Sequence, residues 1–256
     1  MSLERWHLYG IRVPFRNTLV DLRIDDQVIQ IQDLPGPYYL RQIEFAGAPT
    51  RRIRFRNGRG NYCLSDFVPT TLLATAQHPL PIWNQLEYPF NSQFRFDLIQ
   101  PTSEGPEDMW IILHGAHKLA DSSEKLYPDN FRETPYDHPV NVTLGPNQRL
   151  KIPLVLHFNI PFAIRALTAG HTADGVDDPT FETLVQIQDH NGQSFFNTPL
   201  PWDMVFSRTE SNLPVTPSPE LVMPPGRAYT LELVTGAGVG SQAFQFNFAG
   251  ALLNAV

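Results

Sequence analysis

The chain has 256 residues, a formal net charge of −7 and a single cysteine, Cys63. This length allows one large domain or two of ordinary size. The acidic charge argues against binding nucleic acid over the whole surface, and a lone cysteine excludes an intrachain disulfide and a thiolate metal cluster. The sequence has no apolar stretch long enough to span a membrane and no signal-peptide pattern at its N-terminus. We expect a protein made in the cytoplasm that contacts neither nucleic acid nor membrane.

The first half of the chain reads as short strands in sequence order. After an N-terminal segment containing Trp6 come "YYLRQIEF" (38–45) and "TRRIRFRNGRGNYCLSD" (50–66). Asn57-Gly58 lies between the two extended runs of the latter and predicts a type I′ hairpin turn. In "QFRFDLI" (93–99), apolar residues alternate with polar ones, as in a strand with one buried face. Helical periodicity is limited to possible short turns in 65–76 and 201–208.

The second half repeats the first. Pro89, which precedes the strand at 93–99, stands 135 residues before Pro224, which precedes "AYTLELV". The same offset relates Gly115 to Gly250, and an offset of 124 relates 38–45 to 162–169. Asn57-Gly58 matches Asn191-Gly192 at an offset of 134. These matches predict a tandem duplication of a unit of about 120 residues.

The predicted fold is all-β: two tandem β-sandwich, jelly-roll-like domains related by internal duplication. Short strands with turn signals and 24 prolines favour this class. We expect an N-terminal sandwich with an N-terminal arm over 1–119, a linker over 120–139, and a C-terminal sandwich over 140–256. Each long loop is expected to end at its proline, Pro89 or Pro224, where a missing N–H costs least.

The sequence motifs that could carry chemistry are better explained by structure. His114 and His117 form H-x-x-H, which on a strand places the two rings on opposite faces. The glycines of "TGAGVGSQ" (235–242) lie between two strands and predict a turn rather than a phosphate loop. The acidic loop at 171–180 lacks the order of a calcium loop. We predict no catalytic residue, no cofactor and no metal site.

A row of arginines is the unusual feature of this acidic chain. Arg52, Arg54 and Arg56 alternate with apolar Ile53 and Phe55, so the three guanidinium groups should share an outward face. Two interpretations stay open: a charged face that prevents strand aggregation, or a strip that docks an acidic partner. We expect that replacing all three by Gln leaves the melting temperature within a few degrees and weakens attachment to the partner.

The two proline-headed strands, each followed by an apolar-x-apolar-x-Gly segment, resemble small structural proteins of tailed bacteriophage virions. The matching positions are 89–98 with 111–115 and 224–233 with 246–250. The resemblance implies a capsid decoration (cement) or minor capsid protein, of a kind often built from β-sandwiches that assemble as trimers on the head. No functional residue carries over, because such proteins act through their surfaces.

We therefore expect a non-enzymatic virion protein, made in the host cytoplasm, that forms a homo-oligomer, a trimer by the resemblance. Its partners would be the major capsid protein or other virion proteins. Two similar sandwiches could bridge neighbouring subunits bivalently and so stabilise the head. The candidate partner-binding residues are Arg52, Arg54, Arg56, Trp6, Trp83 and Trp202.

One alternative is a carbohydrate-binding β-sandwich of a phage tail, collar or host-recognition device. It would need exposed tryptophans on a flat platform, for which Trp83, Trp110 and Trp202 are candidates. A second alternative is an enzyme of the cupin or glycosidase type, which would need an inward-facing cluster of His or carboxylate residues.

Overall fold

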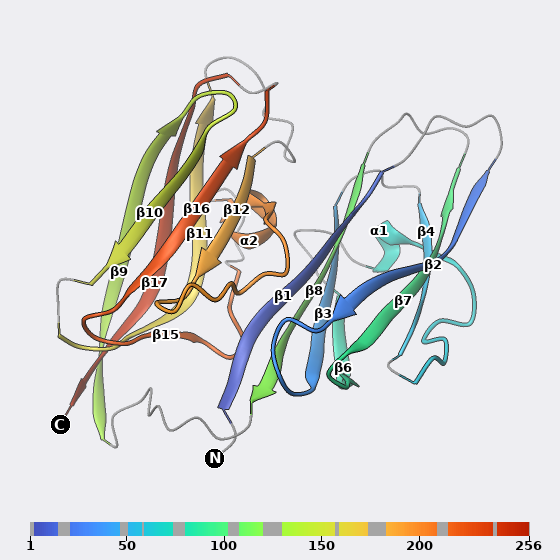
Figure 1. Ribbon diagram of the computed structural model, residues 1–256, viewed down its shortest axis with the longest axis horizontal. Coiled ribbons are helices and arrows are strands. Elements are labelled where there is room, and N and C mark those ends of the chain that lie inside the picture. Colours follow the sequence, from blue (N-terminus) through green and yellow to red (C-terminus); the bar gives the residue numbers. More distant parts are fainter. Residues whose placement is uncertain are drawn as a thin grey trace. The chain divides into compact units, whose positions relative to one another are not determined.

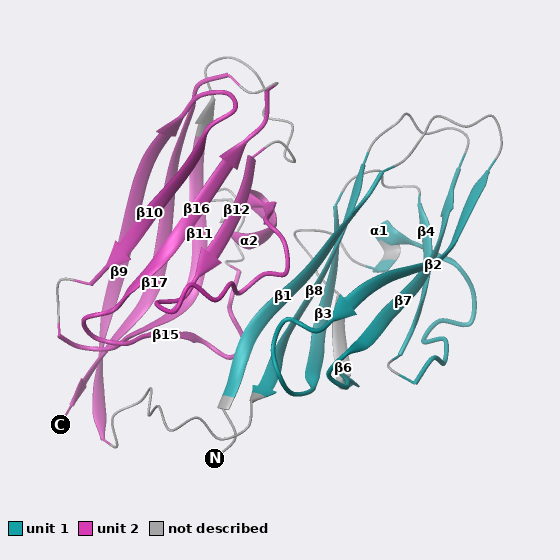
Figure 2. Cartoon of the chain, in the orientation of Figure 1, with its two compact units in different colours: residues 1–122 teal, residues 123–256 magenta. Residues whose placement is uncertain are grey.

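The computed structural model describes residues 3–14, 21–46, 51–57, 59–73, 80–101, 108–119, 130–156, 159–173, 183–208, 215–237 and 240–255, without the side chains at some of them, 80–85 among them. The chain divides into two compact units, residues 1–122 and 123–256. Figure 2 shows the two units in different colours. Each is described here by itself.

Unit 1 is a sandwich of two four-stranded sheets in its described part. Its strands are β1 Leu3–Val13, β2 Leu22–Ile31, β3 Tyr38–Ala46, β4 Arg52–Arg56, β5 Val68–Pro69, β6 Leu80–Tyr88, β7 Ser92–Gln100 and β8 Met109–Leu119. The first sheet has the order β1-β8-β3-β6 and the second β2-β7-β4-β5. All these pairs are antiparallel. This is the strand order of a jelly roll (Figure 1).

Unit 2 repeats that order. Its strands are β9 Phe131–Leu144, β10 Arg149–Val155, β11 Phe162–Ala173, β12 Thr183–Gln188, β13 Leu200–Pro201, β14 Ser207–Arg208, β15 Leu221–Met223, β16 Ala228–Thr235 and β17 Gln242–Ala255. The sheets are β14-β11-β17-β9, with β15 also paired to β11, and β10-β16-β12-β13. The short strands β14 and β15 together take the place of β6. The predicted fold class, two tandem jelly rolls related by duplication, is confirmed.

Short helices also recur at equivalent places. Helix α1, Thr70–Leu73, follows β5, and helix α2, Trp202–Val205, follows β13. Both fall within the segments where the sequence allowed a helical turn.

The glycines of the repeat sit opposite a bulge in each unit. The register between β3 and β8 shifts at Arg41, next to the Leu40–Gly115 pair. The register between β11 and β17 shifts at Arg165, next to the Ile164–Gly250 pair. A Cβ at Gly115 would collide with the carbonyl oxygen of Tyr39, and a Cβ at Gly250 with that of Ala163. Glycine is needed at both positions because the bulge brings the neighbouring backbone too close for any side chain.

The extra residue of each bulge is an arginine paired with a glutamate on the strand beyond. Arg41 Nη2 lies 2.5 Å from Glu4 Oε2 of β1. Arg165 binds both carboxylate oxygens of Glu133 on β9, at 2.7 and 2.6 Å, and Glu220 Oε2 at 2.6 Å. The duplication therefore preserves the bulge and also the ion pair that spans it.

The hairpin turns differ from the expected type. Asn57 Oδ1 accepts hydrogen bonds from the N–H groups of Arg59 and Asn61, at 3.0 Å each. In unit 2 it is Asp189 Oδ1 that accepts in this way, from Asn191 and Gln193, at 2.9 Å each. Among the described residues of these two turns, Gly60 and Gly192 are left-handed. The type I′ prediction was wrong, since Asn191 is not left-handed, and Asn57 corresponds to Asp189.

Three further expectations need correction. Pro89 and Pro224 do not end long loops: each opens a tight turn from one strand to the next, with left-handed Asn91 and Gly226 at matching places. Residues 131–139, expected in the linker, belong to β9. The expected N-terminal arm is strand β1 of unit 1 itself, paired with β8 over its whole length.

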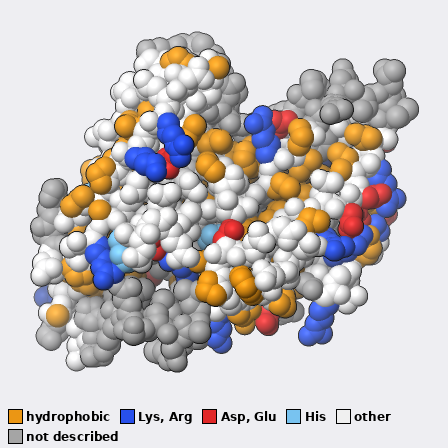
Figure 3. Space-filling view, viewed as in Figure 1, with side chains coloured by type: hydrophobic (Ala, Val, Ile, Leu, Met, Phe, Trp, Pro, Cys, Tyr) orange, Lys and Arg blue, Asp and Glu red, His pale blue; other side chains and the backbone are white. Residues whose placement is uncertain are grey.

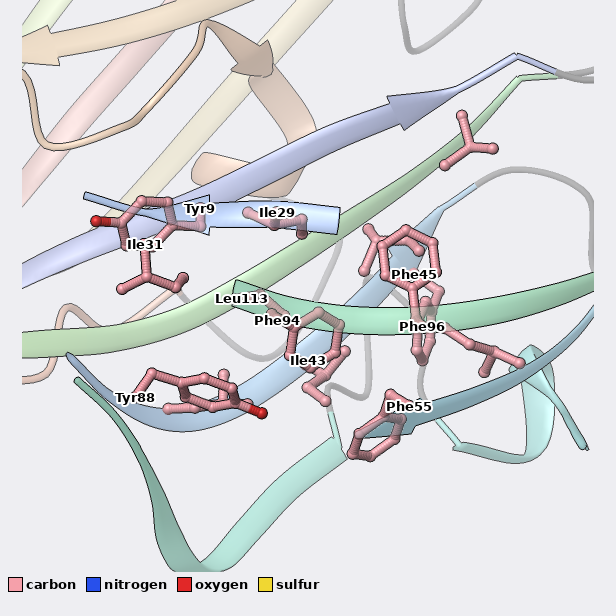
Figure 4. Packing of buried hydrophobic residues seen from close by; sticks show 14 of the residues in the cluster. Tyr9, Ile29, Ile31, Ile43, Phe45, Phe55, Tyr88, Phe94, Phe96 and Leu113 are labelled. Atoms are coloured by element: carbon pink, nitrogen blue, oxygen red, sulfur yellow. The ribbon is translucent and has the colours of Figure 1, made fainter. Parts of the chain in front are cut away.

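The core of unit 1 lies between its two sheets (Figure 4). Phe94, Phe96 and Leu98 of β7 are fully buried and contact Phe55 of β4 and apolar residues of β3 and β8. The alternation read from 93–99 is therefore confirmed. In unit 2, buried residues alternate in the same way along β17 and β16.

Candidate interaction surfaces

The row of arginines on β4 is partly occupied by contacts within unit 1. Arg54 lies opposite Asp97 of β7, and its Nη2 is 3.1 Å from Asp97 Oδ2. Arg56 Nη2 lies 3.6 Å from the other carboxylate oxygen. The side chain of Asp97 is 1% exposed, so these arginines neutralise a buried charge. Basic and acidic side chains lie next to each other near the edge of unit 1 where β2, β4 and β7 run (Figure 3).

Tyr62 completes this network. Its hydroxyl accepts hydrogen bonds from Arg54 and Arg56 and donates one to Asp97, at 2.9 Å. The guanidinium carbons of Arg54 and Arg56 lie 3.7 and 4.6 Å from the centre of its ring, within the range of a cation–π contact. Burial alone would raise the pKa of Asp97, but the N–H of Asp26, Tyr62 and the arginines hold it below its usual value. The network ties the segment after β4 to the outer face of the sheet.

Arg52 differs from its two neighbours. It is exposed, and no described residue forms an ion pair with it. The three arginines share the outward face of β4, as expected, with Ile53 and Phe55 buried between them. They are not equivalent on that face, because Arg54 and Arg56 are paired with Asp97. Unit 2 has Glu232 at the place of Asp97, buried and paired with Arg149 and with Lys151, whose Nζ is 3.4 Å away.

The tryptophans do not form an open platform in the described part of the chain. Trp202 begins α2 and is 1% exposed; Trp6 of β1 and Trp110 of β8 are 2% and 4% exposed. Trp83 lies in β6 rather than in a loop, and its side chain is outside the described part. Trp202 packs against His171 and Phe244 within unit 2 and is therefore not a surface residue of the kind that a docking or glycan-binding role needs.

The face of the β1-β8-β3 sheet that points away from the core of unit 1 is apolar. Trp6, Leu8, Trp110 and Ile112 have the strand parity opposite to that of the core residues Tyr9, Ile111 and Leu113, and none of the four belongs to the core cluster. Glu44 and His114 lie among them, with Glu44 Oε2 and His114 Nε2 2.7 Å apart. Burial raises the pKa of Glu44.

The two histidines of the H-x-x-H motif do lie on opposite faces, as predicted. His114 points away from the core toward Glu44, and His117 points inward, where its Nε2 is 2.9 Å from the hydroxyl of Tyr9. Sequence analysis missed the inward group that His117 joins, which includes His7 and Tyr38. Only the strand pairing shows that these positions meet.

A shallow hollow of about 350 Å³ lies on the outer face of unit 2, over β9, β11 and β17. The hollow lies over the small residues Gly170 and Ala243, and it is bordered by Asn141, Thr143 and Gln245. The lining has no acidic side chain and no arginine or lysine, so it offers hydrogen-bonding groups without charge.

In the part of the chain that the structure describes, no three His, Cys, Asp or Glu side chains are arranged to hold a metal ion. Asp174, Asp177 and Asp178 of the acidic loop lie outside the described residues. No helix of the described part is long and apolar enough to cross a membrane.

The chain matches no protein-family model and no curated protein. It is similar to solved structures, one of them from work on the triple jelly roll fold and turret assembly in an archaeal virus, at 10% identity and a TM-score of 0.26. That match covers 96% of this chain, which spans 60% of the archaeal virus protein. The major capsid protein P2 of bacteriophage PM2 matches at 8% identity and a TM-score of 0.25, over 94% of this chain and 98% of P2.

A third match is the tandem CBM22-1–CBM22-2 domain of Xyn10C from Paenibacillus barcinonensis, at 10% identity and a TM-score of 0.13, over 96% of this chain and 82% of that one. Two of the three proteins are viral, and one of these is a major capsid protein. The tailed-phage part of the expected resemblance stays a prediction. The TM-scores are low, so the fold class rests on strand topology: this is a tandem jelly-roll protein.

Proposed function

We propose that this chain is a non-enzymatic structural protein of a virion, of the capsid decoration or minor capsid kind. The observation that supports the proposal is the complete duplication of a jelly roll within one chain, including the bulges and their ion pairs. Two copies of one fold give one chain two separate surfaces on the same kind of scaffold. A shell made of many identical subunits can bind both copies at once, so that weak single contacts add up to stable attachment.

In this proposal the protein is made in the host cytoplasm and resides in the virion. It binds itself, as a trimer, and it binds the major capsid protein or a neighbouring virion protein. Bridging of adjacent subunits would stabilise the head against opening.

Of the six candidate partner-binding residues, we retain Arg52 and also Trp83, whose side chain lies outside the described part. Arg54 and Arg56 neutralise Asp97, and Trp6 and Trp202 are buried. Arg52 is exposed at the end of the row. The side chain of Arg95 on neighbouring β7 is 43% exposed, and its Nη1 lies 3.6 Å from Oδ1 of Asp26, whose side chain is 55% exposed. These two guanidinium groups could bind carboxylates of a partner from the outer face of the sheet.

The test is to find the protein in particles. Virions purified on a density gradient from the source of the sequence should contain the chain in a fixed ratio to the major capsid protein, measured by quantitative mass spectrometry. Mass photometry of the isolated protein should give three times the chain mass of 29.0 kDa.

The contrary outcome is a chain that stays out of the particle fraction and binds oligosaccharides on a glycan array. That result would replace the structural role by the carbohydrate-binding one. Arg52→Gln with Arg95→Gln should reduce occupancy on the particle, while Lys118→Gln, at an exposed lysine without an ion pair among the described residues, serves as a control for loss of positive charge.

A further inference from the structure

A buried polar cluster lies inside unit 1 at one end of the sandwich. It consists of His7 and Tyr9 of β1, Tyr38 of β3, His117 of β8 and Asp33 from the 32–37 loop. His7 and His117 are 1% and 0% exposed, and their ring centres lie 5.5 Å apart. The cluster therefore holds two titratable rings in contact within a core.

The hydrogen bonds fix the proton positions on His117. Its Nδ1 lies 3.1 Å from the carbonyl oxygen of Gly36, which can only accept, so Nδ1 carries the hydrogen. Nε2 is then the acceptor for the hydroxyl of Tyr9, at 2.9 Å. That hydroxyl oxygen accepts in turn from the N–H of Asp33, at 3.2 Å. A second proton, on Nε2, would leave the hydroxyl hydrogen of Tyr9 without its acceptor.

His7 is constrained in a similar way. Its Nε2 lies 3.1 Å from Asp33 Oδ2 and donates to that carboxylate. Its Nδ1 is buried and has no hydrogen-bond partner among the described residues. Protonation there would create a buried N–H donor with nothing to accept it, which is costly in a core.

These contacts tie the 32–37 loop to the sheet. His7 holds Asp33 by its carboxylate, Tyr9 holds the N–H of the same residue, and His117 holds Gly36. Protonation would keep the two imidazole donors in these contacts, but it would add two buried N–H groups: His7 Nδ1–H without an acceptor, and His117 Nε2–H against the hydroxyl of Tyr9. Moving the loop away would let water solvate both. The charged groups that face the rings are Asp33, from the loop, and Arg5 of β1, which opposes protonation of both.

The described part of unit 2 has no such cluster. By strand pairing, Tyr136 stands at the place of His7, opposite Gly250, and Leu252 at the place of His117, opposite Phe162. His138 stands at the place of Tyr9 and is half-buried, with its Nδ1 3.4 Å from the hydroxyl of Tyr136. Unit 2 therefore serves as an internal reference, because the positions that match His7 and His117 carry Tyr136 and Leu252.

We propose that unit 1 contains an acid-sensitive latch, in which protonation of His7 and His117 releases the 32–37 loop from β1 and β8, while unit 2 stays closed. Burial lowers the pKa of His117 to about 4 and also lowers that of His7, because it disfavours the charged rings. A histidine with a lowered folded-state pKa stabilises the fold above its unfolded pKa. That stabilisation is lost as the pH falls from 6.5 toward 4.

Hydrogen exchange of the full chain tests the latch, with each unit as a reference for the other. Between pH 7 and pH 5, after correction for intrinsic exchange rates, we expect protection of peptides covering 32–40 and 109–117 to fall by about 20-fold. This factor is the linkage effect of one histidine with a pKa of about 4 in the fold and 6.5 when released. Peptides covering 156–164 and 244–252 should change little.

Two variants assign the effect to the rings. His117→Gln with His7→Gln retains polar groups that do not titrate and should flatten the pH response of unit 1. His138→Gln is the matched control in unit 2 and should leave that response unchanged. Should the double variant fold poorly, NMR titration of the His117 ring in the native chain decides the point, with an expected midpoint near 4.

Equal loss of protection in both units would overturn the latch, as would unchanged protection of unit 1 at pH 5 or a His117 midpoint near 6.5. None of these outcomes depends on whether the chain resides in a virion.

Discussion

The two units differ least in their backbone and most in the side chains that the backbone carries. Gly115 and Gly250 face equivalent bulges, and Arg41 and Arg165 bridge them to Glu4 and Glu133. The faces around these features have diverged.

The outer face of the β1-β8-β3 sheet carries Trp6, Trp110 and Ile112, where strand pairing places Pro135, Gln245 and Asn247 in unit 2. Inside the sandwich, unit 1 has the histidine cluster where unit 2 has Tyr136 and Leu252 at the matching positions. The comparison shows that the duplicated fold keeps the glycines and ion pairs at its bulges, where two backbones come close together. The residues on the two faces of each sheet are free to change.

The largest expected effect tests the shared bulge. Gly115→Ala and Gly250→Ala should each destabilise their own unit by about 3 kcal/mol, because the new Cβ meets a backbone carbonyl that cannot move away. Denaturant unfolding of the full chain, followed with probes in each unit, measures the loss. Gly240→Ala, where a Cβ meets nothing within 4 Å, should change stability by less than about 0.5 kcal/mol. A bulge that accepts alanine in either unit would break the equivalence.

A second effect separates Arg52 from its neighbours. Arg54→Gln with Arg56→Gln should destabilise unit 1 by about 2 kcal/mol, because Asp97 keeps its burial and loses both cations. Arg52→Gln should cost less than about 0.5 kcal/mol. Thermal melts of the variants measure both. The structure therefore revises the expectation that replacing all three arginines leaves the melting temperature within a few degrees. Similar small losses for all three would restore it.

The turns provide a smaller test. Asn57→Ala and Asp189→Ala should each cost about 1 kcal/mol, because each side-chain oxygen accepts two backbone N–H bonds in its turn. Asn191→Ala should be close to neutral, because the side chain of Asn191 is exposed and the turn is held by Oδ1 of Asp189. A large loss at Asn191 with none at Asp189 would favour the sequence-based match of Asn57 to Asn191.

The smallest expected effect has the opposite sign. Glu44→Gln should raise the melting temperature by a few degrees at pH 7, because burial raises the pKa of Glu44 and penalises its ionised form. A carboxyl with a raised folded-state pKa adds stability below its unfolded pKa of 4.5 and loses it as the pH rises. The gain should therefore vanish below that pH, while Thr168→Val at the matching place in unit 2 should show no pH dependence. Equal melting temperatures of Glu44→Gln and the parent at pH 7 would contradict this.

The sequence was sufficient for the fold class because the strands that carry it are regular. Phe94, Phe96 and Leu98 alternate without interruption, and the fixed offset from Pro89 to Gly115 survives in unit 2. The turns were harder to predict, because Asn-Gly in both halves suggested the wrong residue as the equivalent of Asn57. Asn57 and Asp189 each accept the turn hydrogen bonds through an Oδ1 atom. Because the two residue types differ, a comparison of the sequences does not pair them.

The candidate sites could be predicted less well, because they depend on what strands far apart in sequence place together. Arg54 appeared to face a partner until pairing placed Asp97 opposite it, 43 residues away. His7 and His117 meet only because β1 and β8 are neighbours in the sheet. Long-range pairing of this kind leaves no local pattern. For Arg54, the available signal in the sequence was Asp97, an acidic residue at an outward-facing position between two apolar residues of its strand, which could pair with an arginine of the arginine-rich strand.

A cryo-EM reconstruction of the purified particle tests the central claim most directly. The account predicts density outside or between the major capsid subunits that fits two jelly rolls per chain, with the orders β1-β8-β3-β6 and β9-β17-β11-β14 recognisable in them, in contact with neighbouring subunits. A fully resolved particle without such density, from a preparation in which the chain is absent by mass spectrometry, would contradict a structural role in the virion.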